Sequence, residues 1–184
     1  TASGAGSAKG ILMQRERGFT LIELLVTIVV LAIVVAVAAP NMSTFIVSQS
    51  VSSQSSELLN ALAFARTEAT KLNANVSVIP ATNSSSGWSN GWCVGPTDMA
   101  NCTSDNVIRN FQSASSGVQI TAPYLQSANR LTFRRDGTLL SGVSAQAFKI
   151  TSPKLEATGT KARCIYIGAI GKASYKKVNR DDDC

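Results

Sequence analysis

The residue whose position suggests the clearest chemical role is Glu23, a carboxylate inside a run of near-continuous apolar character from Phe19 to Ala39. An ionised carboxylate within a membrane costs about 3 kcal/mol, so such an acid is a candidate functional group. Its natural partner is a cation brought into the same dry layer. Cleavage after Gly18 would give Phe19 a free α-amine close to Glu23. In a helical assembly, the carboxylate of one subunit would then pair with the N-terminus of the next.

Four cysteines form two near pairs in the sequence, Cys93 with Cys102 and Cys164 with Cys184. The spacing Cys-x-x-Cys, which is typical of zinc sites and redox motifs, is absent. An even number of cysteines, all beyond the apolar run, favours two structural disulfides formed in an oxidising compartment. We expect the two near pairs to be the bonded ones, although four cysteines permit three connectivities.

The chain contains no histidine, which removes both the commonest general base and the commonest metal ligand. It also has no pair of acids in a glycine-bounded loop. We therefore expect no catalytic residue, no metal site and no cofactor, and the chain is not predicted to be an enzyme.

Basic residues gather near the C-terminus, where they raise the possibility of a nucleic-acid site. Tyr175 lies among them, and an aromatic ring can stack on a base. The acids Asp181, Asp182 and Asp183 follow at once and would repel phosphates. We favour a solvated surface here, and DNA binding stays open as an alternative. The basic residues concerned are Lys172, Lys176, Lys177 and Arg180.

A single long helix is expected to position Glu23. The run from Phe19 to Ala39 would span about 30 Å as a helix, the thickness of a bilayer core. Arg15 and Arg17 precede it, and the positive-inside rule places them on the cytoplasmic side. The rest of the chain then lies across the membrane, in agreement with the cysteines. Of 184 residues, enough remain for one further domain.

A cleaved signal peptide is the main alternative for this segment. The sequence Ala36-Val37-Ala38 is an acceptable cleavage pattern, and cleavage there would release a soluble secreted module. Pro40 just beyond it and Glu23 inside the apolar run argue against that interpretation.

Helical periodicity continues past Pro40 to about Asn73, and Pro40 is expected to kink the helix because it lacks a backbone N–H. Leu58, Leu62 and Ala65 form a stripe that should pack against a sheet. A loop is predicted over Thr82–Asn90, exposed to solvent. Trp92 is expected in the core, and the pattern does not decide whether Trp88 is buried.

From Val76 the pattern changes to short β-like runs, and Asp136-Gly137 between two of them indicates a hairpin. The predicted fold class is α+β, with the long helix packed on a mostly antiparallel sheet. The predicted strands are Val76–Ile79, Val107–Phe111, Val118–Thr121, Leu131–Arg134, Thr138–Leu140, Ala147–Ile150 and Cys164–Ile167.

The N-terminal sequence Arg17-Gly18-Phe19-Thr20-Leu21-Ile22-Glu23-Leu24-Leu25 resembles that of type IV pilins and pseudopilins. The resemblance implies that a prepilin peptidase cuts after Gly18 and that Phe19 becomes methylated. It also implies a domain division into a leader within 1–18, a transmembrane and filament-core helix over 19–40, and a periplasmic head over 41–184. Met13 would begin a short leader, so we expect residues 1–12 to be a cloning scar or a misplaced start.

Short matches in the head resemble the GspH/FimT group of minor pilins and minor pseudopilins, and within it the FimU proteins most. These matches are Leu62-x-x-Ala65-Arg66-x-Glu68-Ala69, Gly91-Trp92, Phe133-x-x-x-Gly137, Arg163 and Gly171-Lys172. In the DNA-binding members of the group the last of these is Gly-Arg-x-Arg. Here Gly171-Lys172-Ala173-Ser174 stands in its place, which weakens the case for DNA.

The resemblance implies a minor pilin that primes assembly of a type IV pilus and is incorporated at or near its tip. Its partners would be other minor pilins, the major pilin and the prepilin peptidase, with the inner membrane holding it before assembly. Two alternatives stay open, namely a DNA-binding minor pilin for DNA uptake and a minor pseudopilin of type II secretion.

Overall fold

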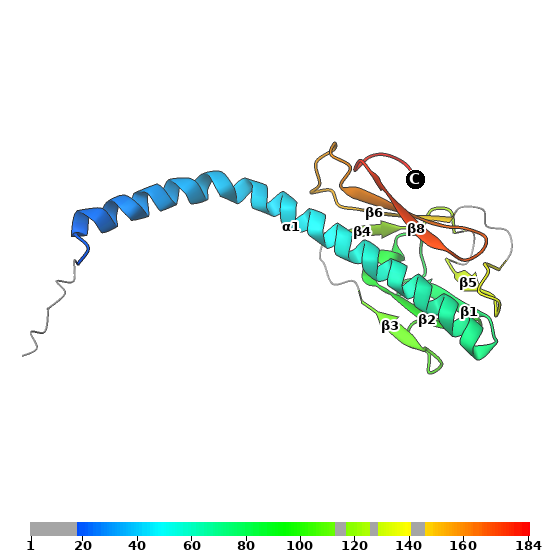
Figure 1. The fold of residues 1–184 in the computed structure, drawn as a ribbon. Helices are drawn as coiled ribbons and strands as arrows, with labels where there is room; N and C mark the ends of the chain where they lie inside the picture. Colours follow the sequence, from blue (N-terminus) through cyan, green and yellow to red (C-terminus); the bar gives the residue numbers. More distant parts are fainter. Residues whose placement is uncertain (1–17, 113–116, 126–128, 141–145) are drawn as a thin grey trace, which may run out of the picture. The chain divides into compact units, whose positions relative to one another are not determined.

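The computed structural model describes residues 18–112, 117–125, 129–140 and 146–184. Within these residues the helix α1, Leu21–Leu72, is followed by eight strands and the short 3-10 helix η1, Gly87–Asn90 (Figure 1). The chain divides into two compact units, one ending at Pro40 and one from Asn41 to Cys184, and each is described by itself.

The N-terminal part of α1 is apolar and uncovered. From Leu21 to Val37 every described side chain is exposed to solvent. No single helix among the described residues meets the length and hydropathy expected of a membrane span, although Leu21–Val37 and Met42–Leu72 do so when taken together. The predicted span from Phe19 to Ala39 and the predicted kink at Pro40 remain predictions.

The C-terminal part of α1 buries one face. Apolar residues recur along it at helical spacing, and they face the interior of the Asn41–Cys184 unit. The members of this buried stripe are Val51, Leu58, Ala61, Leu62, Ala65 and Ala69. The predicted packing of Leu58, Leu62 and Ala65 is therefore confirmed.

The helix ends where the sequence predicts. Asn73 has a φ of 50°, a left-handed conformation that asparagine tolerates at a helix C-terminus. The N–H of Asn73 donates to the carbonyl of Thr70, and the N–H of Ala74 donates to that of Ala69. Together these bonds satisfy two of the carbonyls that a helix end otherwise leaves unpaired.

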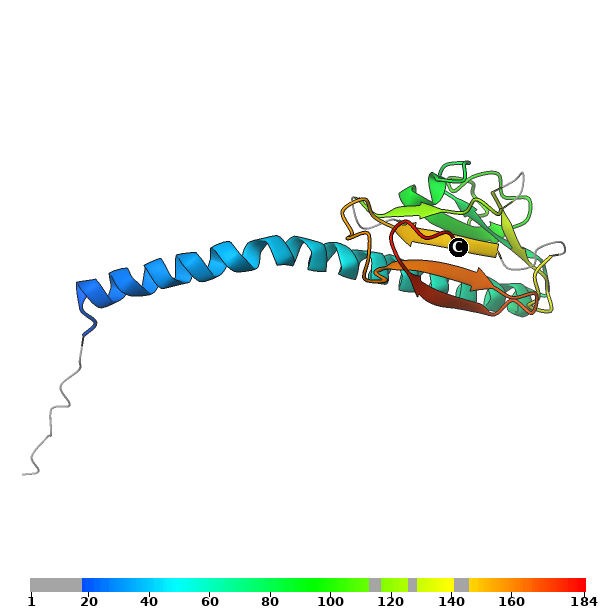
Figure 2. The same ribbon diagram turned by 90° about the horizontal axis from the view of Figure 1, so that it is seen from above.

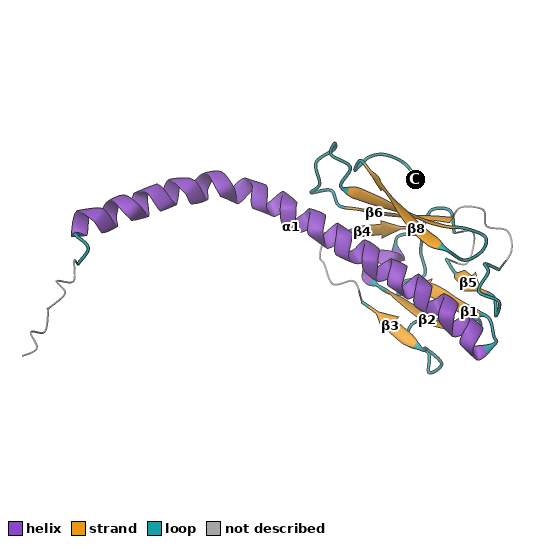
Figure 3. Ribbon diagram, viewed as in Figure 1, coloured by secondary structure: helices purple, strands orange, loops and turns teal. Residues whose placement is uncertain are grey.

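The strands form two antiparallel sheets of four strands each (Figure 3). The first has the order β3-β2-β1-β5, and the second has the order β4-β6-β7-β8. The α+β class with antiparallel pairing is thus confirmed, with two sheets in place of one. The bounds are β1 Val76–Pro80, β2 Trp92–Pro96, β3 Arg109–Phe111, β4 Gln119–Thr121, β5 Leu131–Phe133, β6 Gln146–Thr151, β7 Ala162–Ile167 and β8 Ala173–Val178.

The predicted strand Thr138–Leu140 is wrong, because only a single bridge joins Leu139 to Phe133. The turn before it is nevertheless tight. The N–H of Gly137 donates to the carbonyl of Arg134, and that of Arg134 donates to the carbonyl of Thr138. Only Gly137 of the Asp-Gly pair takes a positive φ, 78°, as in a hairpin loop with a glycine bulge.

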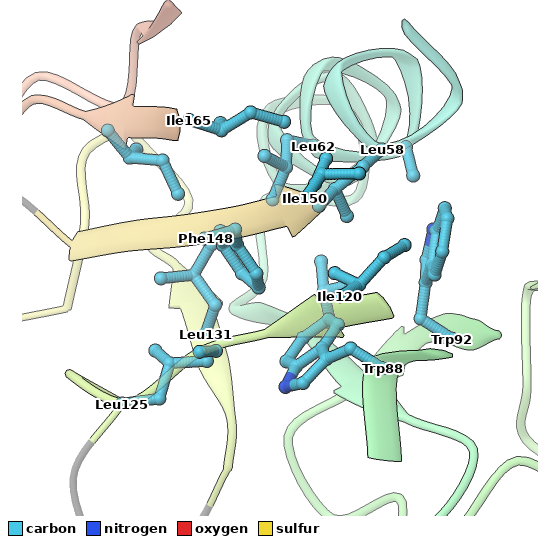
Figure 4. Close-up of a cluster of buried hydrophobic side chains, with 14 of the residues drawn as sticks. Leu58, Leu62, Trp88, Trp92, Ile120, Leu125, Leu131, Phe148, Ile150 and Ile165 are labelled. Atoms are coloured by element: carbon cyan, nitrogen blue, oxygen red, sulfur yellow. The ribbon is translucent and has the colours of Figure 1, made fainter. Parts of the chain in front are cut away.

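The interpretation of Thr82–Asn90 as an exposed loop is wrong at its end, where η1 places Trp88 fully in the core. The Trp88 ring meets Phe148 of β6 edge-on, with ring centroids 4.7 Å apart. Trp92 is buried as predicted. Figure 4 shows both indoles in one cluster with Leu58 and Leu62 of α1 and with Phe148 and Ile150 of β6.

The core is therefore shared by α1 and both sheets. The two views in Figure 1 and Figure 2 show the C-terminal part of α1 running along the strands of this unit. Burying a leucine side chain contributes about 1.5–3 kcal/mol, so the stripe of α1 is a main source of the stability of the head.

Replacing Leu62, which is 1% exposed, by alanine should lower the free energy of unfolding by about 2–5 kcal/mol, because it leaves a cavity where α1 meets the sheets. Chemical denaturation followed by circular dichroism measures this. Leu72→Ala is the matched control, since Leu72 is 52% exposed near the end of the same helix and its loss should cost about 0.5 kcal/mol. Equal effects of the two changes would contradict the assignment of the buried face.

Candidate functional site

The start of α1 brings Thr20 and Glu23 together. The Thr20 hydroxyl oxygen accepts a hydrogen bond from the backbone N–H of Glu23 at 3.2 Å, and the Thr20 carbonyl accepts one from Leu24. Thr20 is therefore the N-cap, and Glu23 occupies the third helical position, where an acid also interacts favourably with the helix dipole. Helix capping alone would thus explain an acid at this position.

Glu23 has two further properties that capping does not require. Its side chain is exposed, and it takes part in no ion pair among the described residues. Phe19, the residue that precedes the cap, is 82% exposed. The carboxylate is thus available to a cation from outside the chain. The structure places Gly18 and Phe19 just before the helix, in exposed chain outside any helix or strand.

Each disulfide joins a strand to a segment outside the sheets. Cys93 of β2 is bonded to Cys102, with Cα atoms 5.5 Å apart. Cys164 of β7 is bonded to Cys184 of the tail, with Cα atoms 5.6 Å apart. These are the two pairs that the spacing of the cysteines favours. The hydroxyl of Tyr166 also donates to the backbone carbonyl of Cys184 at 2.8 Å, so the tail is held at two points.

The basic residues of the tail do not form one cluster. Lys172 lies in the turn before β8 and Arg180 lies after it, so about 20 Å of strand separates them. Lys176 and Lys177 are both exposed, but successive residues of a strand point to opposite faces. Tyr175 lies on the same face of β8 as Lys177. The guanidinium carbon of the buried Arg163 lies 5.8 Å from the centroid of the Tyr175 ring.

Arg180 is already occupied. Its Nε and Nη2 donate to the two carboxylate oxygens of Asp181 at 2.9 Å each, and its Nη1 donates to the carbonyl of Leu155 at 3.0 Å. The hydrogen bonds from Arg180 hold the pKa of Asp181 below its usual range. The guanidinium therefore closes a loop of the head, and an external phosphate would have to compete with Asp181 for it.

A junction that the sequence analysis did not foresee joins α1 to two turns. Arg66 of α1 donates from Nε to the carbonyl oxygen of Gly137 at 3.0 Å. Gly171, in the turn between β7 and β8, lies directly against the same carbonyl, and a Cβ on Gly171 would overlap it. The N–H of Leu139 donates to the carbonyl of Ala169, which ties the two turns to each other.

This junction brings together residues from three of the short matches in the sequence. Arg66, Gly137 and Gly171 belong to different matches far apart along the chain, and they meet at one point of the fold. Asp136 supports the turn by accepting hydrogen bonds from the hydroxyl and the N–H of Thr138. These bonds lower the pKa of Asp136 from its usual value.

Two family models match parts of the chain. The model of the family "Type II transport protein GspH" matches residues 54–171, and that of the "Prokaryotic N-terminal methylation motif" matches residues 13–39. None of the curated protein sequences matches the chain.

Two crystal structures of the type IV minor pilin FimU of Pseudomonas aeruginosa have a similar fold. The first is 18% identical with a TM-score of 0.54, and it covers 68% of this chain and 91% of the FimU chain. The second is 20% identical with a TM-score of 0.55, and it covers 68% of this chain and 87% of the FimU chain.

Both disulfides should be closed in protein made in an oxidising compartment. The double change Cys164→Ser with Cys184→Ser should lower the free energy of unfolding by about 2–4 kcal/mol, because it releases the tail. Non-reducing peptide mapping and chemical denaturation measure the two effects. The double change Cys93→Ser with Cys102→Ser is the comparison. The disulfide that it removes closes a shorter loop, so its loss should lower the free energy of unfolding by less. A peptide that links Cys93 to Cys164 would contradict the pairing.

Proposed function

This chain belongs to the GspH family of minor pilins and pseudopilins, and we propose that it is a minor pilin that primes assembly of a type IV pilus and is incorporated at or near its tip. The observation that carries the proposal is the start of α1. An apolar helix with exposed side chains begins with a capped turn that holds Glu23 free of any partner in the described chain.

The physical basis of assembly is the burial of this apolar surface. From Phe19 to Val37 the large side chains are about half or more exposed in the isolated chain. A bilayer covers them before assembly, and the helices of neighbouring subunits cover them afterwards. Since both surroundings are apolar, moving from one to the other costs little hydrophobic free energy. Specific polar contacts then decide where the subunit stops.

Glu23 is the group that we assign to this contact. Cleavage after Gly18 leaves an amine on Phe19, and Glu23 of one subunit pairs with that amine on its neighbour. In the dry interior of a filament, an unpaired carboxylate is costly, so the pair fixes the axial position of each subunit. The match to the N-terminal methylation motif supports processing at this point.

The proposed location follows from the same segment. The apolar helix holds the subunit in the inner membrane with its head in the periplasm, and assembly then moves it into the pilus. The disulfides of the head suit an oxidising compartment. The proposed partners are the other minor pilins, the major pilin and the prepilin peptidase.

A minor pseudopilin of type II secretion is the second candidate, favoured by the family description itself, which names a type II transport protein. The two machines use the same type of subunit. Deletion of the gene separates them, since loss of surface pili with normal secretion supports the pilus, and the reverse supports the secretion system. DNA binding by the tail is not part of the proposal, because Arg180 is held by Asp181 and Leu155.

Processing should occur between Gly18 and Phe19, with methylation of the new N-terminus, because these residues precede a capped helix in accessible chain. Intact-mass measurement of membrane-extracted protein reads both events. Gly18→Ala should block maturation and leave the melting temperature of the head unchanged. A mature N-terminus at Ala39 would instead identify a cleaved signal peptide and overturn the proposal.

Glu23→Gln is the sharpest test of the assembly role, because glutamine keeps the capping position of the helix but removes the charge. We expect the variant to be cleaved and to accumulate in the membrane, yet to fall at least tenfold in sheared filaments on immunoblots. Thr27→Ala, a polar change in the same exposed stretch, is the control and should assemble normally. Normal assembly of Glu23→Gln would mean that the acid acts only as a cap.

A further inference from the structure

A cavity of about 390 Å³ lies beside the Arg66 junction, within the Asn41–Cys184 unit. One wall is the outer face of α1 and the other is the turn that leads into β8. Its lining contains two cations and no acid, and the other members are apolar or neutral. The lining residues are Leu59, Asn60, Ala63, Arg66, Thr67, Gly171, Lys172 and Ala173.

The guanidinium of Arg66 is oriented and available to bind an anion. The hydrogen bond from its Nε to Gly137 fixes the plane of the guanidinium, and the half-buried position reduces its contact with water. Neither of its terminal nitrogens has a hydrogen-bond partner among the described residues, and the acid two positions on, Glu68, is paired with Lys71. A guanidinium with both terminal nitrogens available is suited to a carboxylate, which accepts two parallel hydrogen bonds.

Lys172 supplies the second charge at the rim of the cavity. It is exposed, and it forms no ion pair in the part of the chain that the structure describes. Two cations that share a cavity repel each other, so an anion placed between them relieves that repulsion and gains attraction from both. In the sequence, Lys172 is grouped with Lys176 and Lys177, whereas the structure places it with Arg66.

The residues that line and surround the cavity favour an acidic side chain over a nucleic-acid backbone as its occupant. Leu59, Ala63 and Ala173 give it apolar walls, which would contact the methylene groups of an acidic side chain. A phosphate backbone instead needs a row of exposed cations along its path. The residues next to Arg66 along the outer face of α1, Ala63 and Thr67, are exposed and neutral and offer no such row.

We propose that this cavity receives a glutamate or aspartate side chain from the adjoining pilin-type subunit, with Arg66 and Lys172 as its partners. The inference rests on the proposed function, because the occupant belongs to a neighbour in the same filament. It adds a second contact, made by the head, to the one made by Glu23. The position on α1 suits this role, since the same helix carries the apolar surface that neighbouring subunits cover.

The test uses the full chain in cells that assemble the filament. A photocrosslinking amino acid at position 63, on the exposed wall of the cavity, should link the chain to another pilin-type subunit through a peptide that contains an acid, as identified by mass spectrometry. Lys172→Glu should reduce the yield of that crosslink roughly tenfold, because it places like charges together. Lys176→Glu is the matched control, since this lysine is exposed on β8 outside the cavity, and it should leave the yield unchanged.

A charge swap makes the result specific. Changing the acid of the crosslinked partner to lysine should lower the yield, and combining it with Lys172→Glu should restore it. Arg66→Glu is avoided as the main variant because Arg66 also supports the turn at Gly137. Equal loss with Lys172→Glu and Lys176→Glu, or no crosslink in filaments that contain the chain, would overturn the inference and leave the proposed function standing.

Two further outcomes also overturn it. If the unaltered chain never enters filaments, the proposed function falls, and this inference falls with it. If instead Lys172→Glu leaves the crosslink intact but abolishes a low-salt shift of duplex DNA by the detergent-solubilised chain, the cavity serves nucleic acid and not a neighbouring subunit.

Discussion

The packing of two separate sheets on one face of α1 is the constraint on which the head depends. No strand of the first sheet pairs with a strand of the second among the described residues. Packed side chains join the two sheets, together with backbone bonds between their turns such as that from Leu139 to Ala169. The stripe of α1 does so by alternating large and small residues. Leu58 and Leu62 reach into the core, and the small residues Ala61, Ala65 and Ala69 are fully buried on the same face. Without this face of the helix, each sheet would expose its apolar side to water.

The Arg66 junction adds a hydrogen bond to that packing at the point where the turns containing Gly137 and Gly171 meet. Gly137 and Gly171 have no side chain, and this allows two turns from different sheets to meet at one carbonyl oxygen. Arg66 then donates to that oxygen from α1. Because the bond has one fixed geometry, it orients the guanidinium and forms one side of the adjacent cavity. The arginine thus has a structural role through Nε and an available surface through its other nitrogens.

Much of the fold could be predicted because local patterns determine it. The helix end at Asn73, the buried stripe and six of the strands follow from periodicity and turn chemistry. Two strands, β2 and β8, were not predicted, and the reasons are physical. The segment of β2 contains glycine and proline, and β8 is an exposed edge rich in lysine, so neither shows the alternation of a half-buried strand. Thr138–Leu140 has strand-like residues but finds only one pairing partner.

The candidate site residues also divide into those that the sequence reveals and those that only the fold reveals. Glu23 stands out in the sequence because a charge inside an apolar run is visible without any knowledge of the fold. Arg66 and Lys172 do not, because each is an ordinary surface residue until the fold brings them to one cavity. The reverse holds for Arg180, which looks like a free cation in the sequence and is paired in the structure. A cation is a candidate site only when the chain leaves it without an acid, and that is a property of tertiary structure. Glu23, Arg66 and Lys172 each lack an opposite charge within the described chain, and in the proposed filament a neighbouring subunit would supply it.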